Sequence, residues 1–144
     1  EAGFETKLIE DAFVYHKRRI DWNKFYTQVK KFGMVRPILN HWHPHSAKIT
    51  YWFPTLFCLG FVGAIVLLFL GILWPISIYA LYFGLLFVHS LVVNKNFKVA
   101  ALSLIAVVIQ FVGYGFGFFK NSILIALSNK KPEELFPKLF FKTL

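Results

Sequence analysis

The chain has 144 residues, of which 57% are hydrophobic and 19% aromatic, while only 16% carry a charge. A chain of this length forms one domain at most, and the apolar excess excludes an intrinsically disordered protein. No Asp, Glu, Lys or Arg occurs between Ile49 and Asn94. Because a membrane-spanning helix needs about 20 apolar residues, this stretch has room for two crossings. A soluble globular domain is therefore largely excluded, and we expect a mainly α-helical membrane protein.

The net charge is +9, and the basic residues flank the apolar block on both sides. Basic residues beside apolar spans favour contact with anionic lipid headgroups or with anionic ligands at the membrane surface. Membrane lipid is therefore the expected partner, and nucleic acid is not. The single cysteine, Cys58, lies inside the first apolar segment, which excludes a disulfide framework.

Residues 1–20 mix polar and apolar positions and predict a short β remnant in two pieces, 7–10 and 12–15. The basic cluster His16-Lys17-Arg18-Arg19 follows directly. Clustered Arg and Lys at the end of a strand can neutralise a diphosphate, and a histidine can ligate a metal. The alternative is an anchor that contacts only lipid headgroups.

Residues 21–37 predict an amphipathic helix that begins at an Asp21 N-cap and ends because of Pro37. Its apolar positions recur every three or four residues, and they are Trp22, Phe25, Tyr26, Val29 and Phe32. Aromatic residues on one face and lysines on another suit a helix lying in the membrane interface. An ordinary amphipathic helix packed on a soluble core is the alternative. A connector at 38–49 follows.

The transmembrane region is expected at 50–119, as about three helices at 50–70, 76–93 and 99–119, before a basic tail at 120–144. The asymmetry of Lys and Arg in the short loops places residues 1–48 and the 94–98 loop in the cytoplasm. Three crossings then put the tail outside, although the tail contains five lysines. Either the tail is an exception or the third segment does not fully cross. Three crossings are kept as the prediction.

Few residues in or near the spans suggest chemistry. His41, His43 and His45 form a His-x-His-x-His run, but no Cys or carboxylate lies nearby, so an interfacial connector is favoured over a metal site. The absence of charged residues from the spans disfavours an ion or proton pathway. Gly113 and Gly117 are spaced as in a close helix contact, which is a weak signal.

Residues 2–19, with the sequence AGFETKLIEDAFVYHKRR, resemble the end of the catalytic domain in bacterial family 2 glycosyltransferases. In that family a Gly-Phe … Ala-x-Val-x-His-x-x-Arg stretch occurs at this place. The run 25–29 with Phe32, Gly33 and Arg36 is similar to the Phe-x-x-Gln … Gly-x-x-Arg helix that follows it. The GYGFGF run at 113–118 is similar to the last span. The resemblance covers residues 2–122 and is most specific over 2–36.

The resemblance implies a C-terminal fragment of a membrane-anchored enzyme of the bacterial inner membrane, with its GT-A type catalytic domain upstream of Glu1. Such an enzyme transfers a sugar with inversion from a nucleotide-sugar donor to a lipid-linked or polysaccharide acceptor. It uses a divalent metal, Mg or Mn, held by an upstream Asp-x-Asp motif. The general base is also expected upstream, so the fragment alone is predicted to be inactive.

The resemblance also implies roles for individual residues. His16, Arg18 and Arg19 would bind the donor diphosphate, with His16 beside the metal. Gln28 and Arg36 would close the active site or contact the acceptor. Seven residues separate Gln28 from Arg36 and a proline follows, which departs from the Gln-x-x-Arg-Trp motif of processive synthases. The alternative function is a non-enzymatic three-span scaffold or assembly subunit.

Overall fold

A computed structural model describes residues 21–140, so the predicted β remnant and the basic cluster at 16–19 lie outside the described residues. The described part contains helices and no strand. In chain order its elements are α1 (Trp22–Trp42), the 3-10 turns η1 (Pro44–Ser46) and η2 (Ile49–Trp52), α2 (Phe53–Phe69), α3 (Trp74–Asn94), α4 (Phe97–Leu127), α5 (Pro132–Leu135) and α6 (Pro137–Phe140). The predicted mainly α-helical membrane fold is confirmed.

Among the described residues, three helical segments are long and apolar enough to cross a bilayer, namely Ile49–Phe69, Trp74–Asn94 and Phe97–Leu127. The first two lie close to the predicted ranges. The third extends well past the predicted end at 119, because the sequence KNSILIAL at 120–127 contains neither Pro nor Gly and is again apolar after three polar residues. The helix therefore includes the first residues of what was predicted to be the tail.

Helix α1 begins as predicted, because the Asp21 side chain accepts hydrogen bonds from the backbone N–H groups of Asn23 and Lys24. The prediction that Pro37 ends it was wrong, since α1 continues to Trp42. A proline inside a helix removes one backbone hydrogen bond. Here Pro37 and Ile38 are buried, Ile38 to 1% exposure, and this burial offsets the lost bond. The predicted connector is correspondingly shorter.

The packed face of α1 differs from the predicted apolar stripe. The buried residues are Val29, Gly33, Pro37 and Ile38. Trp22 and Phe32 belong to the predicted stripe, yet they are 41% and 59% exposed. The face of α1 that packs against the rest of the protein is thus determined by the lack of a Cβ atom at Gly33 as well as by hydrophobicity.

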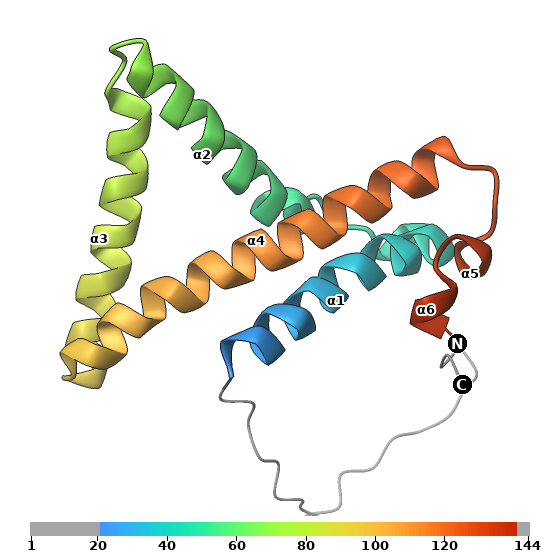
Figure 1. The fold of residues 1–144 in the computed structure, drawn as a ribbon, viewed down its shortest axis with the longest axis horizontal. Coiled ribbons are helices and arrows are strands. Elements are labelled where there is room, and N and C mark those ends of the chain that lie inside the picture. The colour runs from blue at the N-terminus through green and yellow to red at the C-terminus, as the bar shows by residue number, and fades with distance from the viewer. Residues whose placement is uncertain (1–20, 141–144) are drawn as a thin grey trace, which may run out of the picture.

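Three long helices outline a triangle in Figure 1, with α2, α3 and α4 as its sides. A short turn joins α2 to α3, and Gly71 in that turn has the positive φ of 82° that glycine tolerates best. Only Lys95 and Asn96 separate α3 from α4. Helix α4 then passes the start of α2, and α1 lies beside its second half, running in the same direction (Figure 1).

Candidate functional site

Helices α1 and α4 approach each other through three glycines, Gly33, Gly113 and Gly117, which we call the glycine seam. A Cβ atom on Gly33 would overlap the carbonyl oxygen of Tyr114, and one on Gly117 would lie 2.5 Å from the Lys30 carbonyl oxygen. Gly113 faces the Tyr26 ring, which a Cβ would approach to 3.2 Å. Small residues let helix backbones come together in a membrane protein, and here they bring the two backbones into contact.

The neighbouring glycine, Gly115, faces a different helix. Its added Cβ would lie 3.0 Å from the Pro54 carbonyl oxygen at the start of α2. The Thr55 hydroxyl donates a hydrogen bond of 3.0 Å to the Gly115 carbonyl oxygen, and Thr55 is only 3% exposed. Residues two apart in a helix point about 200° apart. The alternating glycines of α4 therefore contact α1 on one side and α2 on the other.

Arg36 connects α1 to the turns that precede α2. Its Nη2 group donates to the Ser46 carbonyl oxygen at 3.1 Å and to the Tyr51 hydroxyl. Its guanidinium carbon lies 3.8 Å from the centre of the Tyr51 ring, which is the stacked geometry that a planar guanidinium favours. The Nε atom is buried, and no acceptor for it occurs within residues 21–140.

Two asparagines add further polar atoms near this end of α1. Asn121 of α4 is 1% exposed, and its Nδ2 group donates a 2.9 Å hydrogen bond to the Met34 carbonyl oxygen. The Oδ1 atoms of Asn40 and Asn121 are buried without a donor in the described part of the chain. Native proteins seldom leave buried polar atoms unpaired, so these atoms can accept hydrogen bonds from water or from a ligand.

A cavity of about 250 Å³ lies between α1, η2 and α4 beside these groups. Its lining residues are Pro37, Asn40, His41, Trp52, Phe118, Ser122, Ile125 and Ala126. We call this cavity and its flanking residues Arg36 and Asn121 the α1–α4 polar site. The site combines one guanidinium with unpaired amide oxygens, which suits hydroxyl-bearing or anionic groups.

The residues predicted to close the active site are not brought together. Gln28 and Arg36 lie about 12 Å apart along the axis of α1. Arg36 is turned toward Tyr51, while the Gln28 side chain makes no hydrogen bond within residues 21–140. The predicted diphosphate-binding residues, His16, Arg18 and Arg19, lie outside the described residues.

The histidine run spans the end of α1 and the turn η1. The rings of His43 and His45 are 5.9 Å apart. No group of three or more His, Cys, Asp or Glu side chains that could hold a metal occurs among the described residues.

Sequence reasoning missed Tyr51, Asn40 and Asn121 as members of the polar site. For Asn121 a signal was present, because Gly113, Gly117 and Asn121 are spaced by four and so share one helix face. For Tyr51 there was none, since its contact with Arg36 depends on how the connector folds.

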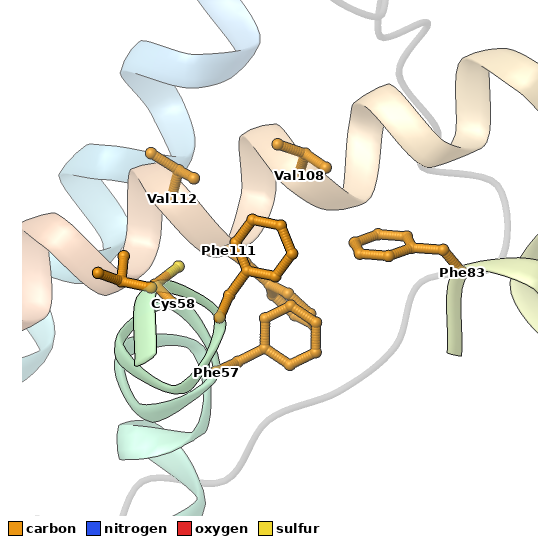
Figure 2. A pocket seen from close by; sticks show the side chains of 8 residues that line it. Phe57, Cys58, Phe83, Val108, Phe111 and Val112 are labelled. Atoms are coloured by element: carbon orange, nitrogen blue, oxygen red, sulfur yellow. The ribbon is translucent and has the colours of Figure 1, made fainter. Parts of the chain in front are cut away.

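A second cavity, of about 220 Å³, lies between α2, α3 and α4 and is shown in Figure 2. Its lining is apolar, with Phe57, Cys58, Phe61, Val62, Phe83, Val108, Phe111 and Val112. Phe57 is at its edge, with ring centres 4.5 Å from Phe111 and 4.9 Å from Tyr79. A cavity of this composition suits a hydrocarbon chain and offers no polar group for chemistry.

The fold and these sites define a helical membrane protein whose apolar helices suit contact with lipid and whose first helix carries four cationic side chains. No protein-family model matches the chain, and neither a curated protein nor a solved structure similar to it was found.

Proposed function

We propose that the chain is the C-terminal membrane segment of an inverting glycosyltransferase. The full-length enzyme would transfer a sugar from a nucleotide-sugar donor to a lipid-linked or polysaccharide acceptor. The observation that carries the proposal is the packing of α1 on α4 through the glycine seam. This contact fixes the segment that follows residues 2–19, where the resemblance is most specific, directly onto the membrane helices.

The chemistry explains why such an attachment matters. A lipid-linked acceptor presents its hydroxyl group at the bilayer surface, so the donor site has to be held at that surface. The cluster at 16–19 precedes Asp21, the cap of α1, by only a few residues. The cationic groups of His16, Arg18 and Arg19 would stabilise the negative charge that grows on the diphosphate as the sugar leaves.

A divalent metal would supply further charge neutralisation when bound. Because the described residues do not form a metal site, its ligands are expected upstream of Glu1, with His16 beside them. We assign no step to the metal.

Arg36 would act as a positioning residue in this enzyme. It holds the connector through Ser46 and Tyr51, and this connector sets where α2 begins relative to α1. Asn40, whose amide oxygen is buried without a donor among the described residues, is one of the residues that line the neighbouring cavity, where acceptor hydroxyl groups would bind.

The test measures sugar transfer by the full-length protein in native membranes. Radiolabelled UDP-glucose, UDP-N-acetylglucosamine and GDP-mannose are supplied separately, and label is counted in the lipid and polymer fractions. We expect transfer from one donor and a loss of about 100-fold in H16A and R19A, with membrane insertion unchanged. T27A, whose exposed hydroxyl bonds only the Asn23 carbonyl oxygen, is the control and keeps full activity.

Unchanged turnover in both H16A and R19A would refute the diphosphate assignment. The gene upstream of Glu1 gives a second test. A reading frame of domain size that encodes an Asp-x-Asp motif is expected for the enzyme. A stop codon just upstream would favour the scaffold function instead.

A further inference from the structure

The positions of α2, α3 and α4 bear on how many times the chain crosses the membrane. Helices α2 and α3 form an open hairpin that diverges from its turn, so the start of α2 and the end of α3 lie at two separate corners of the triangle, both at the open end of the hairpin (Figure 1). Helix α4 begins at Phe97, directly after that end. Eighteen residues later, Gly115 accepts the Thr55 hydrogen bond and touches Pro54 at the start of α2. Phe97 and Gly115 of α4 therefore both lie at the open end of the hairpin, away from the turn at Gly71.

The length of the first part of α4 shows where Gly115 would lie if this part crossed the bilayer. The segment from Phe97 to Gly115 is about 27 Å long, close to the thickness of the hydrocarbon core, about 30 Å. If this segment crossed the bilayer beside the hairpin, Gly115 would lie near the turn at Gly71. It lies at the opposite end, so α4 runs across the base of the hairpin.

Helix α1 gives a second, independent observation. It carries Lys24, Lys30, Lys31 and Arg36, and this number of charges is too costly for the bilayer interior. It nevertheless lies against α4 along the glycine seam, and the Lys30 ammonium is 5.4 Å from the centre of the Phe116 ring. The second half of α4 must therefore lie at the depth of α1.

The sequence of α4 is amphipathic, with one polar and one apolar face. Four of its polar residues, Ser103, Gln110, Tyr114 and Asn121, are spaced by seven, four and seven, so they share one face. Asn121 on this face contacts α1. On the opposite face are the exposed apolar residues Ile105, Val108, Val112, Phe119 and Ile123. Lys98, seven residues before Ile105, is the charged residue at the start of this face.

The C-terminal residues return to α1. The ring centre of Phe140 in α6 lies 5.7 Å from that of Trp42, the last residue of α1. Because α1 precedes the hairpin, this contact puts the end of the described chain on the same side as residues 21–48.

We propose that α4 lies in the plane of the membrane interface beside α1, with its exposed apolar face inserted into the acyl region, and that only α2 and α3 cross. The surface formed by α1 and α4 then binds the lipid bilayer itself. The lysines of α1 carry the charge that complements anionic headgroups. The basic segments among residues 21–140, including the tail with Lys130 and Lys131, then lie on one side, as the asymmetry of Lys and Arg requires. On this proposal the third predicted span, although long and apolar enough to cross, lies in the interface instead.

The first test is cysteine labelling of the full chain in a C58A background. The single variants are H45C before the hairpin, L73C at its turn and K130C in the tail. Each places one thiol at an exposed position. A membrane-impermeant maleimide is added to inside-out and to right-side-out vesicles. We expect H45C and K130C to label from the same side and L73C from the other. Labelling of K130C from the side of L73C would overturn the proposal.

The second test measures depth by spin labelling, with accessibility to oxygen and to a nickel complex as the readout. Labels at I105C, V112C and F119C share one face of α4, and labels at I78C, L85C and V92C provide a matched series on α3. We expect one depth along α4, and along α3 steps of up to about 10 Å, the rise of seven residues. Steps of that size along α4 would overturn the proposal even if labelling of the tail were ambiguous.

Discussion

The two contacts that α4 makes are built in opposite ways. Against α1 it presents the glycine seam, where backbone meets backbone and the Asn121 amide seals the contact with a hydrogen bond. Against α2 it packs closely at Gly115, whose carbonyl oxygen accepts a hydrogen bond from the Thr55 hydroxyl. Away from Gly115 it presents large rings such as Phe111 to α2 and α3, and an apolar cavity of about 220 Å³ remains between the helices. The α1–α4 contact depends on glycines, which have no Cβ atom to keep the helices apart. The aromatic contact depends on large side chains that other large apolar side chains can replace.

The difference follows from the surroundings. In lipid the hydrophobic effect does not drive helices together, so close packing and hydrogen bonds decide which contacts are specific. The glycine seam provides both. The aromatic contact includes a hydrogen bond from the Tyr79 hydroxyl of α3 to the Phe57 carbonyl oxygen of α2. Helix α4 contributes apolar side chains to it, and acyl chains can fill the gaps beside them. We therefore expect the α1–α4 contact to be sensitive to substitution and the α2–α3–α4 contact to be tolerant.

The sharpest challenge to this comparison is G33A. The added Cβ would overlap the Tyr114 carbonyl oxygen, and backbone atoms cannot move away as a flexible side chain can, so the helices must separate. We expect a loss of about 3 kcal/mol in the free energy of unfolding, measured by SDS titration in mixed micelles. The matched control is G63A, whose Cβ would meet nothing within 4 Å. Equal stabilities for G33A and G63A would contradict the role of the seam.

Substitution of Arg36 tests the polar end of the same contact. R36L removes the hydrogen bonds to Ser46 and Tyr51 and the stacking on the Tyr51 ring. We expect a loss of about 2 kcal/mol in the same titration. K31L removes a cation from an exposed position of α1 and should change the free energy of unfolding by less than about 0.5 kcal/mol. If K31L lowered the free energy of unfolding as much as R36L, the loss of a positive charge would explain both results, and the specific contacts of Arg36 would not be needed.

A smaller effect is expected from Asn121. N121L keeps the number and branching of the side-chain heavy atoms, with methyl groups that are larger than the amide oxygen and nitrogen, and it removes the hydrogen bond to the Met34 carbonyl oxygen. It also removes an unpaired Oδ1 atom, which partly offsets the loss. We expect a decrease of about 1 kcal/mol, again from SDS titration. N94L, at an exposed asparagine that bonds only Ser90 one turn before it, is the comparison and should cost less.

The smallest effect is predicted in the aromatic contact. F57L replaces a ring that touches Tyr79, Tyr82, Phe83 and Phe111. Because the adjoining cavity is apolar and open to lipid, acyl carbon can occupy the space left by the ring. We expect a loss of about 0.5 kcal/mol from the ring contacts alone. A loss as large as that of G33A would show that the aromatic contact is specific after all.

Composition predicts the hairpin well, because a long segment without charge has few alternatives to a pair of membrane helices. The start of α1 is also predictable, since Asp21 caps it through local hydrogen bonds. The end of α1 is not, because Pro37 is accommodated by burial between elements far apart in the sequence. The contact between Arg36 and Tyr51 joins α1 to the second of the two 3-10 turns, fifteen residues further along the chain, and no local pattern encodes it.

The turn between α2 and α3 has a consequence for how the protein enters its membrane. It consists of Leu70, Gly71, Ile72 and Leu73, none of which is charged. Placing a Lys, Arg or Asp at the centre of the bilayer costs about 2.5–3.5 kcal/mol on insertion scales, and this turn avoids that cost entirely. In the topology we propose, the hairpin can therefore pass through the membrane as one unit during biogenesis, while the lysines and arginines of residues 21–140 stay on the side from which they were synthesised.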